Sequence, residues 1–310
     1  MTKNKYIIGS RGSELALWQS NWVKSELEKL FMGIEIEIKI IKTKGDKILD
    51  VSLSKIGDKG LLTKEIENAL LDREIDMAVH SLKDLPTSLT DGLTIGAVSE
   101  RIEQRDVFIS NSYINLDDVP SGAKIATGSL RRKSQLLNYR PDLQIVDLRG
   151  NITTRINKYD DSDWAGLILA YAGVKRLGLD NRIRQVIPTE IILPAVSQGV
   201  MAVESREGDN DLLEIVRKIN NNNSEIETKA ERSFLKALQG GCQVPIGVYS
   251  RINGNELEME VMVGSLDGKV VLRAFKNGNI TEPEKLGQEL ADALIEKGAV
   301  EILELIRENQ

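Results

Sequence analysis

Apolar and polar positions recur along the first hundred residues with two different periods. Residues 34–40 alternate almost perfectly, which predicts a strand with one buried face. Between Ser13 and Leu30 the apolar residues instead return at helical spacing, which predicts an amphipathic helix. Further strand-like runs occur at 6–8, 77–79 and 93–98, with a helical pattern at 62–72. Alternating strands and helices are typical of α/β folds built on parallel sheets.

A second block with the same alternation follows from about residue 105. Its predicted strands are 124–127, 145–147 and 167–170, and its predicted helices are 130–139 and 152–157. The order strand, Gly-Ser, arginine, helix occurs at 7–11 and again at 126–131, so the two blocks either form similar lobes or match by chance. The strand-like segment 200–203 is placed to cross back into the first block.

The pattern changes after the polar run 220–223. Ser224 and Glu227 have the spacing of a capping box, which predicts the start of a helix that stops at Gly240. Three strands in series and a long amphipathic helix from Glu282 then predict a small α+β domain. We therefore expect three domains: 1–100 with 200–217, then 105–195, then 220–310.

Composition narrows the possible functions. The chain has 310 residues, and 47 acidic against 41 basic side chains give a net charge of −6, which argues against a general nucleic-acid binder. No apolar run approaches the ~20 residues that span a bilayer, and no secretory stretch follows Met1. One cysteine and one histidine exclude an internal disulfide and a Cys/His zinc cluster, and they fit a reducing cytosol.

One segment opposes the overall charge. Residues 124–158 carry eight basic and two acidic side chains, a local charge of +6. Several of these arginines follow strand ends, where open α/β sheets bind ligands. Convergent arginines at that edge predict a ligand with several negative charges; a solvated basic face is the alternative. RNA is a rival polyanion, but only 4% of the residues are aromatic and able to stack on bases.

Four short segments can carry chemistry. The two Gly-Ser turns present backbone N–H groups at helix starts beside Arg11 and Arg131, although tight turns with surface arginines explain them equally well. In the segment 80–84 the carboxylate of Asp84 can exchange protons, but a Lys-Asp pair in a turn is commoner, and His80 is more readily a structural histidine. Cys242 follows Gly-Gly, which lets a bulky group approach the backbone and favours an attachment site, although a free cysteine is more commonly buried and inert.

Several motifs occur together in the order of one family. They are GSRGSELA at 9–16, VHSLKDLP at 79–86, GSLRR at 128–132, DLRGN at 147–151, ERSF at 231–234 and LQGGCQVPIG at 238–247. Over essentially its whole length the chain resembles the porphobilinogen deaminases, also called hydroxymethylbilane synthases. The resemblance implies two similar α/β domains of the type-II periplasmic-binding-protein kind, followed by a small α+β C-terminal domain.

The resemblance also implies an activity and a cofactor. Members of this family are transferases of tetrapyrrole biosynthesis, and they join four porphobilinogen molecules head to tail into hydroxymethylbilane, with release of four ammonia. They extend a dipyrromethane cofactor held by a thioether to a loop cysteine, here Cys242. The family's catalytic aspartate falls on Asp84. We expect a cytoplasmic monomer that acts on this small molecule without a metal, nucleic-acid or membrane partner.

Each pyrrole carries an acetate and a propionate, so a chain of pyrroles has many negative charges. The resemblance therefore implies that this pyrrole chain is the anionic ligand of the basic segment 124–158. Residues 42–60 are expected to form a lid; Lys59 lies within it and Leu62 just after it. Such a lid can limit the access of water to the cation that is left when ammonia departs. The expected cofactor and substrate carboxylate-binding residues are Arg11, Ser13, Ser81, Lys83, Thr127, Gly128, Ser129, Arg131, Arg132, Arg149, Arg155, Ala170, Arg176 and Gln198.

Two positions depart from the family pattern. Leu62 stands where a phenylalanine is expected, and Ser197 alters a run of small residues around Gln198. A two-lobed anion-binding protein without catalysis is the rival hypothesis. The absence of a secretory stretch, the third domain with Cys242 and the acid at Asp84 all count against it.

Overall fold

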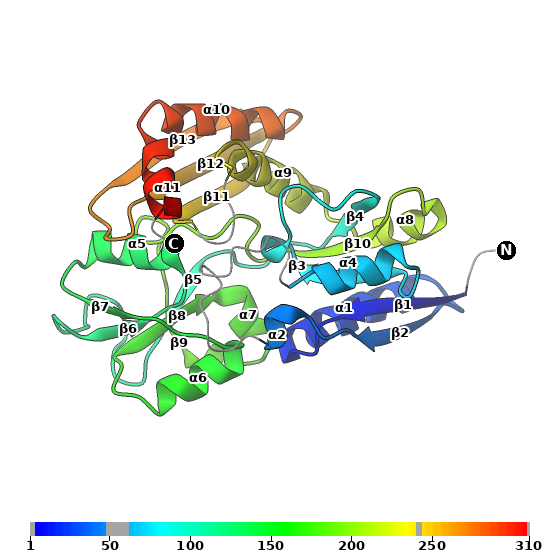
Figure 1. Cartoon of the computed structure of the whole chain (residues 1–310), viewed down its shortest axis with the longest axis horizontal. Helices are drawn as coiled ribbons and strands as arrows, with labels where there is room; N and C mark the ends of the chain where they lie inside the picture. The colour runs from blue at the N-terminus through cyan, green and yellow to red at the C-terminus, as the bar shows by residue number, and fades with distance from the viewer. Residues whose placement is uncertain (1–3, 48–61, 240–243, 309–310) are drawn as a thin grey trace. The chain divides into compact units, whose positions relative to one another are not determined.

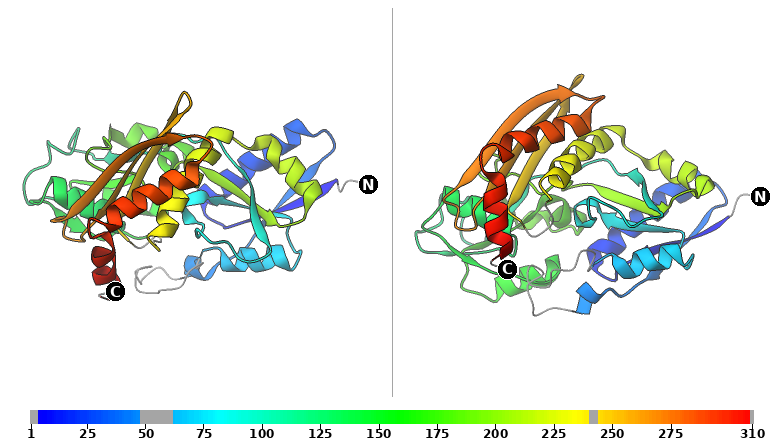
Figure 2. Two further views of the ribbon diagram at one scale, coloured as in Figure 1. Left: turned by 90° about the horizontal axis from the view of Figure 1, so that it is seen from above. Right: turned by 45° about the horizontal axis from the view of Figure 1, so that its top comes forward.

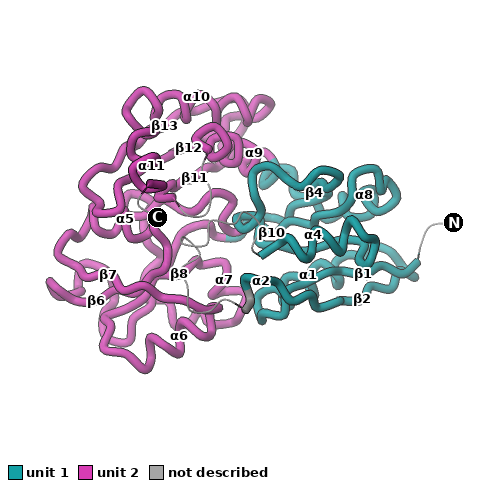
Figure 3. The backbone as a smooth tube through the Cα atoms, in the orientation of Figure 1, with its two compact units in different colours: residues 1–49, 57–102, 200–225 teal, residues 50–56, 103–199, 226–310 magenta. Residues whose placement is uncertain are grey.

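The computed structural model of the chain describes residues 4–47, 62–239 and 244–308, and it is a mixed α/β protein with three sheets (Figure 1). The chain divides into two compact units (Figure 3). The first unit contains the described residues up to 47, then 62–102 and 200–225. The second unit contains 103–199 and the described residues from 226 onward.

The first unit is built on a five-stranded sheet with the order β2-β1-β3-β10-β4. Strands β1, β2 and β3 are parallel, whereas β10 runs antiparallel to both β3 and β4. Its elements are β1 (Lys5–Ser10), α1 (Glu14–Leu30), β2 (Glu35–Ile40), α2 (Lys44–Lys47), α4 (Lys64–Leu71), β3 (Met77–Ser81), the 3₁₀ turn η1 (Leu82–Asp84), β4 (Leu93–Val98), β10 (Met201–Arg206), α8 (Asn210–Val216) and the 3₁₀ turn η3 (Arg217–Ile219).

The sequence pattern explains why these elements pack. Helix α1 buries Val23 and Leu27 against Ile8 and Met77 of the central strands, and its N-terminus is capped by the side chain of Ser13. Burial of such apolar side chains stabilises the fold by roughly 2 kcal/mol each. The strand β2 at the edge of the sheet buries Ile36 while its charged residues face solvent, as the alternation predicts.

The second unit repeats this topology. Its five-stranded sheet has the order β7-β6-β8-β5-β9, with β6, β7 and β8 parallel and β5 antiparallel to β8 and β9. Its elements are β5 (Asp106–Ile109), β6 (Lys124–Ala126), α5 (Leu130–Tyr139), β7 (Gln144–Val146), α6 (Ile152–Asp160), β8 (Gly166–Ala170), α7 (Tyr171–Arg176), the 3₁₀ turn η2 (Asp180–Arg182) and β9 (Ile183–Val186). Because β6 occupies the place of β1 in the strand order, the short Gly-Ser repeat reflects two similar lobes.

The second unit also contains an antiparallel sheet of β11 (Ile246–Asn253), β12 (Glu256–Gly264) and β13 (Val271–Asn279). Helix α10 (Pro283–Ile295) lies along β12 and β13, as the views in Figure 2 show. Helix α11 (Ala299–Glu308) and the larger part of α9 (Asn222–Ala237) complete this part. Phe234 of α9 and Leu290 of α10 are buried in its core.

The fold class is therefore confirmed: two similar α/β sheets and a small C-terminal α+β part. The residue limits of the three domains stay a prediction. Among the residues that the structure describes, no helix is both long and apolar enough to span a membrane.

Two local predictions need correction. Helix α9 begins two residues before Ser224, so the predicted capping box is wrong. Asn221 accepts the hydrogen bond from the Ser224 N–H instead, and the Ser224 hydroxyl accepts one from the Arg101 N–H. Asparagine caps helices as well as serine does, so the sequence alone could not show whether Asn221 or Ser224 caps α9. In the predicted lid loop, residues 44–47 form the short helix α2, and 48–60 lie outside the described residues.

Candidate active site

In the first unit, an acidic turn follows the carboxyl end of β3. Leu82 and Leu85 are buried and anchor the turn η1. Lys83 and Asp84 lie between them in the sequence and are half-buried. The Asp84 carboxylate makes no hydrogen bond or ion pair with any residue that the structure describes. The alternative of a structural Lys-Asp pair therefore finds no support.

The first Gly-Ser turn lies at the same edge. Strands β1 and β3 are parallel neighbours, with Gly9 opposite Ala78, so the residues after both strands meet at one edge of the sheet. Arg11 and Ser13 follow β1, and Ser13 accepts a hydrogen bond from the Ala16 N–H at 3.4 Å, which caps α1. The Ser81 hydroxyl at the end of β3 accepts one from Gln19 of α1 at 2.8 Å.

His80 has a structural environment. Its Nε2 lies 3.1 Å from Oε2 of Glu204 on the neighbouring strand β10, and both side chains are buried. The structure therefore favours the structural reading of this histidine over a catalytic one.

In the second unit, the turn from β6 into α5 is tight. Ser129 caps α5 by accepting a hydrogen bond from the Arg132 N–H at 3.4 Å, and its own N–H donates to the Thr127 hydroxyl at 3.3 Å. A Cβ at Gly128 would lie 2.6 Å from the backbone oxygen of Leu148, so only glycine fits there. The turn thus presents backbone N–H groups and the positive end of α5 at the carboxyl edge of this sheet.

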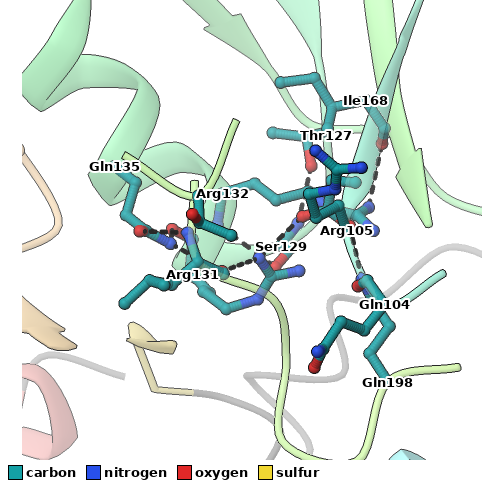
Figure 4. A network of polar contacts seen from close by, with 12 residues as sticks. Gln104, Arg105, Thr127, Ser129, Arg131, Arg132, Gln135, Ile168 and Gln198 are labelled. Carbon is teal, nitrogen blue, oxygen red and sulfur yellow. Dashed lines mark hydrogen bonds and ion pairs between the residues drawn. The ribbon is translucent and has the colours of Figure 1, made fainter. Parts of the chain in front are cut away.

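Arg131 and Arg132, labelled in Figure 4, do not lie on a solvated face. Both side chains are almost fully buried, and both form ion pairs with Asp106. Arg131 Nη1 donates to Asp106 Oδ2 at 2.7 Å, and Arg132 Nη2 donates to Oδ1 at 2.8 Å. Burial by itself would raise the pKa of the Asp106 carboxyl, but the two guanidiniums outweigh it and hold the pKa well below its usual range. Asp106 is therefore ionised throughout the physiological pH range.

Three further arginines that the sequence predicts for the site lie after the parallel strands of this unit. Arg149 follows β7 and lies 3.5 Å from Asp147, while Arg155 of α6 donates to the Gly150 carbonyl at 2.7 Å. Ala170 ends β8, and α7 after it carries Arg176, which donates to the Gly199 carbonyl at 2.9 Å. Burial lowers the pKa of the Arg176 guanidinium to about 10, so it still carries its charge at neutral pH.

Gln198 is also close to this group. It is buried, and its Nε2 donates to the Gln104 carbonyl at 2.7 Å and to Asp106 Oδ1 at 2.9 Å (Figure 4). Its amide nitrogen is therefore engaged within the protein.

Asp106 is not among the site residues expected from the sequence. A carboxylate that begins the otherwise apolar strand β5 is unusual, and that was the available signal. Its two arginine partners lie 25 and 26 residues away in the sequence, so the pairing itself could not be predicted.

Some expected site residues are not tested by this geometry. Cys242 and Lys59 lie outside the described residues, and Leu62 is half-buried just before α4. Within the described ranges, no group of three or more His, Cys, Asp or Glu side chains could hold a metal ion.

Comparisons with known proteins agree with one another. Residues 6–214 match the family model "Porphobilinogen deaminase, dipyromethane cofactor binding domain", and residues 225–296 match "Porphobilinogen deaminase, C-terminal domain". The chain is 53% identical over 305 residues to the porphobilinogen deaminase of Carboxydothermus hydrogenoformans, covering 98% of both chains. It is 49% identical over 311 residues to that of Chlorobaculum tepidum, covering 99% of this chain and 100% of the relative.

Solved structures with more distant sequences also resemble the chain. The methionine binding protein MetQ aligns with a TM-score of 0.42 and 15% identity, over 70% of this chain and 88% of that one. A periplasmic substrate-binding protein of an ABC transporter from Coxiella burnetii aligns with a TM-score of 0.44 and 15% identity, over 68% and 90%.

Proposed function

This chain belongs to the porphobilinogen deaminase family, and we propose that the residues described above carry out that family's reaction. The enzyme is a transferase, hydroxymethylbilane synthase, which condenses four porphobilinogen molecules into hydroxymethylbilane and releases four ammonia. It uses a dipyrromethane cofactor in tetrapyrrole biosynthesis. The assignment of individual residues to parts of this reaction is the proposal.

The donor set in the second unit fits a dipyrromethane with its acetate and propionate groups. Guanidinium groups bind carboxylates with two parallel hydrogen bonds, and the backbone N–H groups of the Gly128-Ser129 turn add neutral donors. The buried Nε of Arg132 has no hydrogen-bond partner among the described residues, so it retains a donor for an anionic group. When bound, the cofactor supplies the pyrrole carbon that acts as the nucleophile.

We assign carboxylate binding to residues at the carboxyl edges of the two sheets. In the first unit these are Arg11, Ser13, Ser81 and Lys83. In the second unit they are Thr127, Gly128, Ser129, Arg131, Arg132, Arg149, Arg155, Ala170 and Arg176, with Gln198 acting through its contact with Asp106. Cys242 holds the cofactor through a thioether, and Lys59 and Leu62 contribute to a lid.

Asp84 handles the protons of each condensation in this proposal. A carboxylic acid can donate a proton to the departing amino group. The carboxylate that remains can stabilise the resulting cation and then accept the proton that the attacking pyrrole loses. The observation that carries this role is the position of Asp84: half-buried at the edge of β3, beside Lys83, and unpaired among the described residues. No Ser, Cys or His nucleophile is needed, because a pyrrole carbon attacks.

Replacement of Asp84 by asparagine tests this assignment. Asn keeps the size of the side chain but cannot transfer protons, so we expect kcat to fall by at least ~10²-fold, the usual range for loss of a general acid–base group. The cofactor should remain attached, which intact mass would verify. Asp91→Asn is the matched control, because Asp91 is an exposed aspartate in the turn before β4 and should show unchanged turnover.

Near-normal product formation by Asp84→Asn would refute the role of Asp84. Loss of the cofactor together with activity would instead assign Asp84 to cofactor assembly or retention, and would likewise contradict the proposal.

We also propose that the protein is a cytoplasmic monomer without a nucleic-acid or membrane partner. The single cysteine supports the cytoplasmic location, and the net charge of −6 argues against a nucleic-acid partner. Light scattering on the purified chain would measure its mass in solution, and a dimer at micromolar concentration would contradict it.

A further inference from the structure

Three donors from two segments converge on one buried carboxylate in the second unit. Asp106 is fully buried at the start of β5 and accepts hydrogen bonds from Arg131 at 2.7 Å, Arg132 at 2.8 Å and Gln198 at 2.9 Å. Arg131 and Arg132 lie on the first turn of α5, and Gln198 precedes β10. Both carboxylate oxygens are engaged, so the orientation of the Asp106 side chain is fixed by its partners.

Asp106 and two carbonyl groups hold one side of the arginine pair. Arg131 Nη1 donates to the Leu193 carbonyl at 2.6 Å as well as to Asp106, and Arg132 Nη1 donates to the Ile168 carbonyl at 2.9 Å. These contacts stop the two guanidiniums from rotating. The Nε of Arg132 is left without a partner in the described part of the chain, so the constraint spares at least one donor.

The charges of this group are incompletely balanced. Two buried guanidiniums share one carboxylate, which leaves one positive charge in a region where a further buried charge needs a partner. An anionic substituent of a ligand would supply that partner. Asp106 thus lowers the free-energy cost of burying two positive charges close together. Because it balances only one of them, the arginine pair still attracts the carboxylate of a ligand.

Gln198 is itself held in place by the backbone. Its Nε2 also donates to the Gln104 carbonyl at 2.7 Å, and the preceding Ser197 donates its N–H to Glu231 of α9 at 2.6 Å. The amide of Gln198 is therefore directed at Asp106 Oδ1 by contacts on both sides.

We infer that Asp106 is a positioning residue, which fixes the guanidinium groups of Arg131 and Arg132 in the orientation that binds pyrrole carboxylates, with Gln198 as its support. This inference rests on the proposed function, since it assumes that these arginines bind the carboxylates. Asp106 touches neither the cofactor nor the substrate in this account. Its contacts order the arginine side chains when the protein folds. Binding of the ligand therefore loses less side-chain conformational entropy.

A double-mutant cycle on the cofactor-loaded enzyme tests the inference. Asp106→Glu keeps the charge but displaces the carboxylate by one methylene, so we expect the KM for porphobilinogen to rise about tenfold or more, with a smaller effect on kcat. Arg132→Lys should also raise KM, because lysine cannot make a bidentate contact. Asp106 also holds Arg131, so Asp106→Glu should keep part of its effect in the Arg132→Lys background. We expect the loss of kcat/KM that it adds there to be clearly smaller than the loss that it causes in the wild type.

The matched control is Asp76→Glu in the first unit. Asp76 is also buried beside an arginine, 3.7 Å from Arg206, and it accepts a hydrogen bond from the Ile7 N–H at 2.7 Å. It precedes β3, so it lies at the opposite edge of the sheet from Asp84. We expect Asp76→Glu to lower the melting temperature and leave KM unchanged, which separates general destabilisation from lost positioning.

The outcomes are distinguishable. Unchanged KM in Asp106→Glu with impaired Arg132→Lys would overturn the inference while leaving the proposed function in place. Full additivity of the two replacements would overturn it as well. Unchanged KM in Arg132→Lys would contradict the proposed carboxylate-binding role itself.

A second variant covers the case in which Asp106→Glu does not fold. Gln198→Met removes one donor to Asp106 at nearly constant volume. We expect a smaller rise in KM, and this rise should be reduced further in the Arg132→Lys background. An unchanged KM in Gln198→Met, at an unchanged cofactor content, would count against the positioning network.

Discussion

Ser197 has a backbone conformation that residues with a side chain rarely adopt. Its φ is +62°, in the left-handed region, and its hydroxyl is buried without a hydrogen-bond partner among the described residues. The left-handed conformation costs about 1 kcal/mol for a residue other than glycine, and an unpaired buried hydroxyl costs a similar amount. The departure from the family pattern at this position therefore carries an energetic cost.

We predict that Ser197→Gly stabilises the protein. Relief of backbone strain and removal of the unpaired hydroxyl outweigh the greater entropy of glycine in the unfolded chain, for a net gain of about 1 kcal/mol. Thermal unfolding should show a higher melting temperature for Ser197→Gly than for Ser197→Ala, which keeps the strain. A lower melting temperature for the glycine variant would contradict this prediction.

Single residues differed in how far the sequence could predict them. Asp84 and the Gly-Ser turns follow strand ends, and strand ends could be located from the apolar pattern. The apolar pattern could not show which charged residues are buried. Arg131 and Arg132 fit a solvated face as well as a ligand site in the sequence, whereas the structure buries both beside Asp106. Contacts between distant segments depend on how sheets and helices pack, which no local pattern records.

At the scale of elements, the N-terminus of α5 has two functions that one substitution can separate. Ser129 caps the helix and, in the proposed function, also faces the carboxylates. Aspartate caps helices as well as serine does but carries a negative charge. We predict that Ser129→Asp keeps the melting temperature but raises the KM for porphobilinogen at least tenfold by repelling carboxylates.

Ser129→Ala serves as the comparison. It should lose about 1 kcal/mol of stability with the cap while leaving the charge unaltered. If Ser129→Asp bound porphobilinogen normally, the start of α5 would not be part of the carboxylate site.

The turn between β12 and β13 fixes the C-terminal sheet against α5. Gly268 has a φ of +72°, and a Cβ there would lie 2.5 Å from the Asn138 backbone nitrogen and 2.6 Å from the Ser134 carbonyl oxygen. Because both are backbone atoms of a helix, neither can move away cheaply. We predict that Gly268→Ala lowers the free energy of unfolding by about 3 kcal/mol, through strain and overpacking together.

Gly254→Ala is the matched control for this prediction. Its φ is +61°, but nothing lies within 4 Å of the added Cβ, so only the backbone penalty of about 1 kcal/mol applies. Equal losses in the two variants, measured by thermal unfolding, would mean that the turn does not pack on α5.

Most strands and helices were predicted, some from a clear period and some from a short apolar run, but β5 was not. Helix 130–139 was predicted with the bounds that α5 has, because its polar and apolar residues alternate at helical spacing. Strand β5 was missed, since its continuous apolar run Val107–Ile109 has no period, and short buried runs fit strands and helices equally. The order of strands within each sheet depends on tertiary contacts and could not be predicted.

At the scale of the whole molecule, two lobes of one topology carry different parts of the proposed chemistry. The first supplies the unpaired carboxylate of Asp84, and the second supplies most of the arginines. This division explains how a chain with a net charge of −6 contains a segment of +6: the basic residues are concentrated where a polyanionic ligand would bind. The charge asymmetry was visible in the sequence, whereas the shared topology of the lobes was only suggested by a short repeat.

The intact mass of the protein after brief exposure to porphobilinogen tests the central claim most directly. The account predicts a resting mass above that of the polypeptide by two porphobilinogen units less two ammonia, then a series of species that each add one unit less one ammonia. Cys242→Ser should show no stable adduct, and Asp84→Asn should carry the resting adduct without extending it at the normal rate. A wild-type chain that keeps the mass of its bare polypeptide throughout would contradict the account.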